Sequence, residues 1–235
     1  PEAIVDWLES KMCSTNELEG TTILVTAGGT QESIDPVRYI GNRSSGKMGY
    51  AIAEQAARMG AKVILVSAPT SLPIPNGVDF ISVDSAVSMQ EAVEARYNDV
   101  NVVIMAAAVS DFRVLHKAEQ KIKKMESMTI ELVKNPDILQ GLGSKKNHQI
   151  LVGFAAETEH VIKYGQDKVA RKNLDMLVAN DVSKSNAGFN VDTNEGYFLY
   201  PDKEPKEMPN MKKSELARHI LREVIDLVAN KADIN

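Results

Sequence analysis

Three features of the 235-residue sequence predict an α/β fold, with a Rossmann-like, mainly parallel sheet and helices on both faces. Short β-branched runs alternate with segments of helical periodicity. The apolar run Val102–Val109 is typical of a strand that is buried on both faces. Unusual glycine-rich and polar stretches follow three of the predicted strands, where ligands bind in open parallel sheets.

Each element rests on its own local pattern. Compact apolar and β-branched runs predict strands at Ile23–Thr26, Val63–Ser67, Phe80–Val83, Val102–Ala106, Ile150–Phe154 and Met176–Ala179. Apolar residues at three- and four-residue spacing predict helices at Gly46–Met59, Ser85–Tyr97, Glu159–Asn173 and Ser214–Ala229. The segment Glu195–Glu204 is typical of a short hairpin. The strand from Val102 is the predicted centre of the sheet.

The chain is predicted to divide at residue 20. Residues 1–20 are expected to form an N-terminal helix and a linker, because Pro1 and Glu2 suit a first helical turn and residues 10–20 are polar. Residues 21–235 are expected to form one domain. The first residue is Pro rather than Met, which suggests a processed chain or a piece of a longer one.

Composition narrows the class of protein. The formal net charge of −5 argues against a surface that binds nucleic acid and leaves room for local sites that bind small anions. A single cysteine, Cys13, provides neither a disulfide framework nor a cysteine metal site. No apolar run approaches the roughly twenty residues that span a bilayer. We therefore expect a cytoplasmic protein without a membrane or nucleic-acid partner.

The loop after the first strand is a candidate phosphate site. It begins with Gly28 and Gly29 and ends with Ser44, Ser45 and Gly46 at the start of a predicted helix. Glycines let the backbone approach a phosphate, and the amides at a helix N-terminus attract anions. Ordinary turn glycines followed by a serine N-cap explain the same residues, so both interpretations remain open at this point.

Three other nucleotide-binding signatures fail or are weak. The segment from Gly41 resembles a phosphate-binding P-loop, but Met48 stands where a hydroxyl should bind magnesium. The glycine spacing is not that of a dinucleotide-binding loop, and Ser67 follows the second strand where an acidic residue is required. Tyr164 and Lys168 have the Tyr-x-x-x-Lys spacing of short-chain reductases without a suitable upstream serine. The glycine pair and the Tyr-Lys spacing nevertheless make an NAD(P)-dependent reductase the alternative function.

Two further loops carry candidate residues. Ala107 and Ala108 leave room for a ligand ring, and Asp111 can accept hydrogen bonds from a sugar or cap the next turn. A dense cationic stretch with Lys121, Lys123 and Lys124 follows, and its lysines can neutralise charge on a phosphate during transfer. Phe154 stands at the end of another strand, where its ring either packs in the core or stacks on a ligand.

Taken in order, these motifs resemble the bacterial phosphopantothenoylcysteine synthetases from about Thr21 to Ala229. The shared blocks are Thr-Ala-Gly-Gly-Thr, Asp-Pro-Val-Arg-Tyr-Ile, Asn-x-Ser-Ser-Gly-Lys-Met-Gly, Ala-Ala-Val-Ser-Asp-Phe, Lys-Ile-Lys-Lys, Lys-Asn-Pro-Asp-Ile-Leu, Gly-Phe-Ala-Ala-Glu-Thr and Ala-Asn-Asp-Val. Each block alone is weak evidence, whereas eight in the same order are specific. The resemblance implies a ligase that joins 4'-phosphopantothenate to L-cysteine through an acyl-cytidylate, with CTP converted to CMP and pyrophosphate.

The resemblance also implies roles for single residues. Asn42 and Lys121 would be catalytic: Asn42 would hold the substrate carboxylate, and Lys121 the charge on the α-phosphate. Arg38 would bind the pantothenate phosphate, and Ala108 would contact this substrate too. Contacts with the nucleotide would come from Gly28, Gly29, Ser44, Ser45, Gly46, Ala107, Asp111, Lys121, Phe154, Lys123 and Lys124.

The partners are likewise implied by the resemblance. Mg²⁺ would enter with the triphosphate, so no protein ligand of the metal is named. A homodimer would complete the substrate site. A flavin-dependent decarboxylase would precede the chain, and Pro1–Val5 resembles the tail of such a domain.

Overall fold

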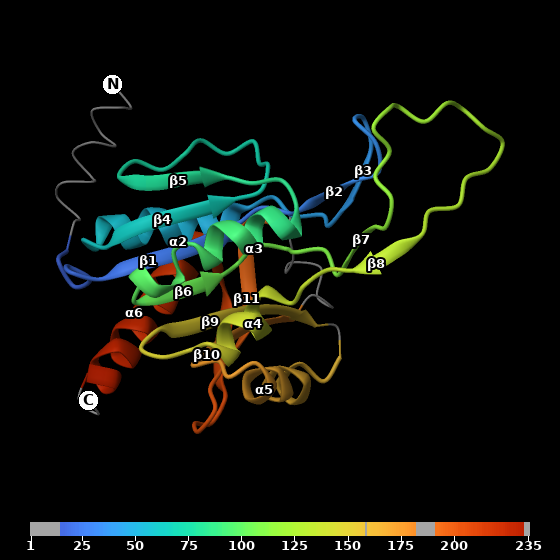
Figure 1. The fold of residues 1–235 in the computed structure, drawn as a ribbon. Coiled ribbons are helices and arrows are strands. Elements are labelled where there is room, and N and C mark those ends of the chain that lie inside the picture. The colour runs from blue at the N-terminus through green and yellow to red at the C-terminus, as the bar shows by residue number, and fades with distance from the viewer. Residues whose placement is uncertain (1–14, 158, 182–190, 233–235) are drawn as a thin grey trace.

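The computed structural model describes residues 15–157, 159–181 and 191–232, which build one large sheet covered by helices (Figure 1). The sheet contains β1 (Thr22–Ala27), β4 (Lys62–Ser67), β5 (Val78–Ser82), β6 (Val102–Met105), β9 (Ile150–Glu157), β10 (Met176–Asp181), β11 (Thr193–Leu199) and β12 (Lys206–Lys212). Their order is β12-β11-β10-β9-β6-β1-β4-β5. All pairs are parallel except those of β11 with its two neighbours. The predicted mainly parallel sheet is confirmed.

Helices cover both faces of this sheet. Helices α2 (Lys47–Arg58) and α6 (Lys213–Ala232) share one hydrophobic core, and α3 (Ala86–Glu94), α4 (Ile138–Ser144) and α5 (Val161–Arg171) share the other. Successive residues of a strand face opposite sides, so Ile23 and Val25 enter the first core and Leu24 enters the second. Strand β6 is buried along its whole length and pairs with β1 and β9, which confirms its predicted place inside the sheet.

The predicted strands and the four predicted helices are present, with shifted ends. Strand β9 continues past Phe154 to Glu157 because it pairs with the polar end of β10, so the residues directly after Phe154 lie in a strand and not in the predicted loop. The hairpin spans Thr193–Lys212 instead of Glu195–Glu204. Helix α4 was not predicted, since it has only seven residues and two of them are glycines.

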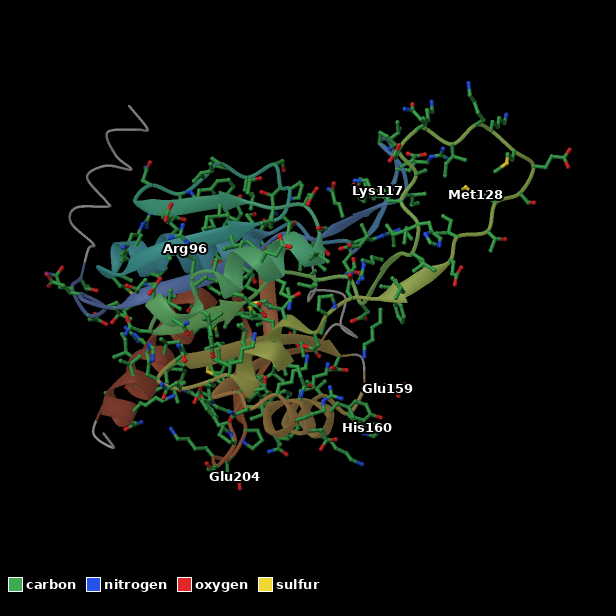
Figure 2. All side chains as sticks on the ribbon, viewed as in Figure 1. Arg96, Lys117, Met128, Glu159, His160 and Glu204 are labelled. Atoms are coloured by element: carbon green, nitrogen blue, oxygen red, sulfur yellow. The ribbon has the colours of Figure 1, made fainter. Side chains whose placement is uncertain are left out.

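Two short ribbons form an arm that the sequence did not predict. Strands β2 (Gln31–Ser33) and β3 (Tyr39–Gly41) make one ribbon, and β7 (Phe112–Val114) and β8 (Leu132–Lys134) make the other. Three residues are too few to show a strand periodicity. Together with the loop between β7 and β8, which includes Met128, the ribbons project away from the main sheet (Figures 1 and 2). The name "arm" is used below for residues 31–41 and 112–134.

The segment before β1 contacts the domain. Leu18, within the expected linker, is only 2% exposed and belongs to the core beside α2. Backbone hydrogen bonds join the amides of Thr15 and Leu18 to the carbonyls of Arg58 and Met59. The predicted N-terminal helix and Cys13 lie outside the described residues. Within the described part of the chain, no helix is long and apolar enough to cross a membrane.

Gly49 lets helix α2 pack directly against β1. A Cβ atom on Gly49 would lie 2.6 Å from the Cβ of Ala27 and 2.8 Å from the carbonyl oxygen of Thr26. Carbon atoms do not approach a well-ordered strand this closely, so any larger residue pushes the helix outward. The helix start, which faces the candidate site described below, is therefore held at a distance that only glycine allows.

We predict that Gly49→Ala lowers the free energy of unfolding by about 1–3 kcal/mol, because the added methyl group overpacks the contact between α2 and β1. Gly141→Ala in α4 is the matched control, since no atom lies within 4 Å of the added Cβ. The control should raise stability by about 0.5–1 kcal/mol through helix propensity. Urea unfolding measures both; wild-type stability of Gly49→Ala would contradict the close packing.

Candidate active site

The loops after β1 and β6 are joined to each other at the point where the strand order changes direction. The chain runs from β1 through β4 to β5 on one side and then returns to β6 on the other side of β1. The amide of Ala108 donates to the carbonyl of Gly28 at 2.8 Å. The amide of Thr30 donates to the carbonyl of Ala108 at 3.2 Å. Ligands of open α/β sheets bind at such a switch point.

Two buried threonines hold the loop after β6 in place by hydrogen bonds. The hydroxyl oxygen of Thr26 accepts a hydrogen bond from the amide of Ala107 at 3.1 Å. The hydroxyl oxygen of Thr30 accepts one from the amide of Ser110 at 2.9 Å. On the other side, the side-chain amide of Asn135 donates to the carbonyl of Ser110 at 2.8 Å. Residues 107–111 are thus held in place without a ligand.

Helix α2 begins at the same place, and glycine is required at its N-cap. Gly46 has φ of 76°, and a Cβ there would lie 2.6 Å from the Cγ2 of Thr70. No side chain of the described residues caps the helix, so the interpretation of Ser44 or Ser45 as an N-cap is wrong. The first amides of α2 are therefore available to an anion.

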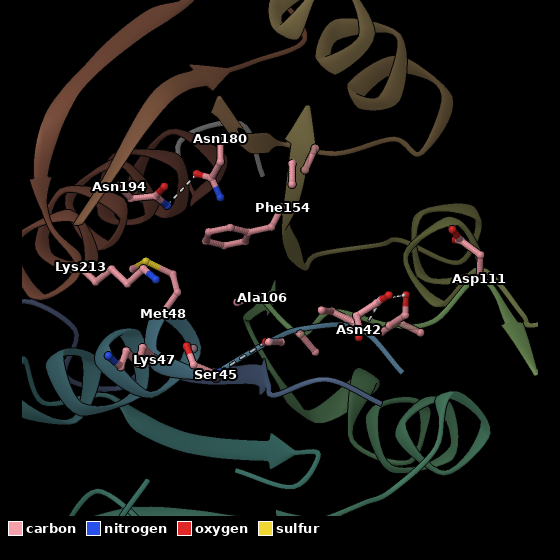
Figure 3. A pocket seen from close by; sticks show the side chains of 18 of the residues that line it. Asn42, Ser45, Lys47, Met48, Ala106, Asp111, Phe154, Asn180, Asn194 and Lys213 are labelled. Atoms are coloured by element: carbon pink, nitrogen blue, oxygen red, sulfur yellow. Dashed lines mark hydrogen bonds between the residues drawn. The ribbon is translucent and has the colours of Figure 1, made fainter. Parts of the chain in front are cut away.

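These elements enclose a cavity of about 350 Å³, called the central pocket below (Figure 3). Eight of the residues predicted from the sequence line it: Asn42, Ser44, Ser45, Gly46, Ala107, Ala108, Asp111 and Phe154. They come from three separate segments of the chain. The fold therefore brings most of the predicted site together around one cavity.

Asn42 stands where the first loop meets the loop after β6. Its side-chain amide lies 3.4 Å from the carbonyl oxygen of Ala108 and 3.3 Å from that of Val109, and donates to both at long range. Asn42 also lines a neighbouring groove together with Gly29. Gly28 lines neither; with φ of 78° it lies so close to Ala68 that a Cβ would be 2.6 Å from its carbonyl oxygen. Gly28 thus shapes the turn beneath the site.

A second cavity adjoins the central pocket. Its lining combines Ala107, Asp111 and Phe154, which it shares with the central pocket, with Asn135 and Ile138 near the start of α4. The two cavities therefore meet at the Phe154 side chain and the loop after β6. An elongated ligand can occupy both, with a flat ring in one and a charged group in the other.

The Tyr-x-x-x-Lys pair does not form a reductase site. Tyr164 is 44% exposed and packs edge-on against the His160 ring at 5.7 Å. Lys168 lines the central pocket and forms an ion pair with Glu157. Tyr164 is not among the residues that line this pocket.

Besides Lys168, sequence reasoning missed four polar side chains of the central pocket. Lys47 is the first residue of α2 and Lys213 the first of α6, while Asn180 and Asn194 lie on β10 and β11. The side-chain amide of Asn194 donates to the side-chain oxygen of Asn180 at 2.8 Å. Lys47 and Asn180 lie in blocks that carry the resemblance, but nothing in the pattern near Lys213 or Asn194 indicated a site. No three His, Cys, Asp or Glu side chains cluster as metal ligands among the described residues.

The remaining predicted residues lie on the arm and do not line the central pocket. Arg38, Lys121, Lys123 and Lys124 line a shallow groove between the two parts of the arm. Arg38 donates to the carbonyl of Ile122 at 2.7 Å and pairs with Asp35 at 2.8 Å. These four cationic residues are therefore gathered on one surface of the arm.

Asp35 connects the two parts of the arm. Its carboxylate is 2% exposed and accepts hydrogen bonds from the amides of Val37, Arg38 and Ile122, as well as from the Arg38 guanidinium. Burial alone would raise its pKa, but these hydrogen bonds outweigh burial and lower the pKa of Asp35 from 3.8 to about 2. Asp35 thus positions Lys121 and Lys123, which flank Ile122.

Residues 18–228 match the family described as "DNA/pantothenate metabolism flavoprotein C-terminal domain". The chain belongs to this family. It is 47% identical over 231 residues to the coenzyme A biosynthesis bifunctional protein CoaBC of Bacillus subtilis, covering 97% of the chain and 57% of that protein. The CoaBC protein of Escherichia coli K12 is 45% identical over 230 residues, covering 96% of the chain and 56% of that protein. The chain thus spans little more than half the length of these relatives.

A solved structure matches the same half. The crystal structure of the C-terminal domain of CoaBC superimposes on this member of the DNA/pantothenate metabolism flavoprotein C-terminal domain family with a TM-score of 0.80. The two sequences are 44% identical, and the match covers 92% of this chain and all of that chain. The Rossmann-like fold is therefore shared along the whole of the solved domain.

We predict that Asp35→Asn loosens the arm at neutral pH, because a neutral amide offers one acceptor oxygen where the carboxylate offers two. Hydrogen exchange of the Ile122 amide should become faster by an order of magnitude or so. Because the pKa of Asp35 is lowered, the wild-type contact is present above pH 3.8 and is lost as pH falls through about 2. Equal exchange in the two proteins at neutral pH would contradict this role.

Proposed function

We propose that this chain is a CTP-dependent ligase that joins 4'-phosphopantothenate to L-cysteine in coenzyme A biosynthesis. The observation that carries the proposal is the central pocket, which is lined at the switch point of the sheet by eight of the residues expected for such a synthetase. The 44% identity to the whole solved C-terminal domain of CoaBC supports the same assignment. We also propose that a decarboxylase partner supplies a second activity, because these relatives are named bifunctional proteins.

In the proposed first step, a carboxylate oxygen of 4'-phosphopantothenate attacks the α-phosphorus of CTP. The bond from that phosphorus to the bridging oxygen breaks, and pyrophosphate leaves with the electron pair. The side-chain amide of Asn42 donates to the substrate carboxylate, next to the carbonyl groups of residues 108 and 109. Lys121 neutralises charge that grows on the α-phosphate once an arm, from this chain or from a second copy, covers the pocket.

In the proposed second step, the amine of L-cysteine attacks the acyl carbonyl carbon. The acyl–oxygen bond breaks, CMP leaves, and the amine loses a proton as the amide forms. The reactive anhydride must be kept from water until cysteine arrives. Lys123 and Lys124 lie on the same loop as Lys121 and, in this proposal, belong to the flap that covers it.

We place CTP across the two adjoining cavities. Asp111, at their common edge, accepts hydrogen bonds from the ribose, while Phe154, Ala107 and Ala108 border the base. The uncapped amides at the start of α2, with Ser44, Ser45 and Gly46, bind the triphosphate. Mg²⁺ enters with the triphosphate as part of the substrate, held mainly by phosphate oxygens.

The arm supports a homodimer. Ten large hydrophobic side chains are exposed among the described residues, and seven lie on the arm: Val37, Tyr39, Phe112, Leu115, Met125, Met128 and Leu132. A concentrated apolar surface of this kind marks an interface. We propose that a second copy of the chain covers it, and that Arg38 binds the pantothenate phosphate at the partner's pocket.

The first test omits cysteine. We expect a purified preparation given 4'-phosphopantothenate, Mg²⁺ and CTP to release pyrophosphate and to accumulate an acyl-cytidylate that mass spectrometry detects. ATP should give no adduct if the site selects cytosine. An adenylate in the ATP sample would correct the nucleotide while keeping the ligase. No adduct and no pyrophosphate with either nucleotide, in a sample shown to be dimeric, would refute the proposal.

We predict that Asn42→Asp and Lys121→Gln slow acyl-cytidylate formation by different routes. A carboxylate at position 42 repels the substrate carboxylate, which should lower kcat/KM for 4'-phosphopantothenate by about 100-fold or more.

Loss of the Lys121 charge should lower kcat far more than it weakens CTP binding. Lys117→Gln, an exposed lysine four residues away on the arm, is the matched control. Equal losses in rate and binding for Lys121→Gln would contradict its role.

A further inference from the structure

Two lysines from distant parts of the sequence lie at one end of the central pocket. Lys47 opens α2 and Lys213 opens α6, and both line the cavity. Figure 3 shows them on the side of the pocket opposite to Asn42 and Asp111, with Met48 and Ser45 nearby. Neither lysine is required by the mechanism described above.

Their surroundings favour a negatively charged ligand. Lys213 is only 7% exposed, and burial, followed by the neighbouring Lys47, lowers its pKa, while Asp192 acts in the opposite direction. Two ammonium groups near each other in a half-closed cavity repel, and an anion between them removes the repulsion. The uncapped start of α2 adds amide donors and a partial positive charge at the same end.

The carboxylate that pairs with Lys47 is easily displaced. The Nζ atom of Lys47 lies 2.6 Å from Oδ1 of Asp192, and the Asp192 side chain is 82% exposed. An ion pair this open to water contributes little stability. A phosphate that approaches from inside the pocket can therefore exchange with Asp192 at Lys47 at little cost.

Within the described part of the chain, a buried amide oxygen in the same pocket lacks a hydrogen-bond donor, which a water molecule on the Mg²⁺ that accompanies the nucleotide can supply. Asn194 is 3% exposed and lines the same pocket, and its Oδ1 atom has no hydrogen-bond partner among the described residues. Asn194 lies at an irregularity in the pairing of β11 with β12. An unsatisfied buried polar atom is costly, and bulged strands often border binding sites.

We propose that Lys47 and Lys213 form the subsite for the β- and γ-phosphates of the nucleotide and for the pyrophosphate that departs. This inference rests on the proposed function, which places the ribose at Asp111 and the α-phosphate near Asn42. From there the triphosphate extends across the start of α2 toward Lys213. When the bond between the α-phosphorus and the bridging oxygen breaks, the two lysines stabilise the charge that pyrophosphate takes with it.

The test is calorimetric titration of CMP, CTP and pyrophosphate, each with Mg²⁺, into dimeric wild-type protein and four variants. Lys213→Met should weaken CTP and pyrophosphate binding by about 10-fold or more while CMP binding changes less than about 2-fold. Lys47→Met should show the same selectivity with a smaller loss, because Lys47 gives up an ion pair. Lys212→Met, one residue before Lys213 and exposed, should match the wild type. Asp192→Asn should bind CTP at least as tightly as the wild type.

Each outcome decides the matter. Equal weakening of CMP and CTP, or wild-type binding of CTP and pyrophosphate by Lys213→Met, overturns the subsite. If CMP and CTP binding weaken equally but the wild type still ligates, the subsite is wrong and the proposed function stands. A wild type that neither ligates nor binds CTP overturns both the subsite and the proposed function. If Lys213→Met does not fold, as judged by circular dichroism, Lys47→Met and the charge-retaining Lys213→Arg carry the comparison. Selective loss in Lys47→Met with CTP binding retained in Lys213→Arg supports the subsite.

Discussion

The parallel pairing of β1 with β6, continued into their loops, is the constraint on which the site depends. Hydrogen bonds between Gly28, Thr30 and Ala108 extend the sheet past the last paired residues of the two strands. The hydroxyl groups of Thr26 and Thr30 then hold the amides of the second loop. Buried hydrogen bonds of this kind keep a loop rigid, because breaking one leaves an unsatisfied donor. The walls of the central pocket are therefore set before any ligand binds.

Two separate sets of cationic side chains belong to the proposed site. One set lines the central pocket and begins α2 and α6, where partly buried cations face a cavity. The other set lies on the arm, where Asp35 fastens the loop that carries Lys121 to the turn that carries Arg38. In a single chain these sets are separate. A reaction that uses both requires the arm to move or a second chain to bring its own arm, and the exposed apolar residues of the arm favour the second route.

Several features of the fold followed from local patterns, and others did not. The uninterrupted apolar run from Val102 predicted a strand buried on both faces, and β6 is such a strand. The end of β9 was misjudged because Ala156 and Glu157 carry no strand signal and are ordered by pairing with Asn180 and Asp181. The strands of the arm are three residues long and are stabilised by each other, so no periodicity could reveal them.

The sequence by itself determined the fold class, the family resemblance and eight residues of the central pocket, because these depend on short blocks with a fixed order. Only the tertiary structure decided that Arg38 and Lys121 lie away from that pocket, and that Lys213 lies within it. Lys47 and Lys213 are far apart along the chain and meet only because α2 and α6 pack on the same face of the sheet. Contacts between distant segments arise from packing of the whole chain, and no local pattern of residues encodes them.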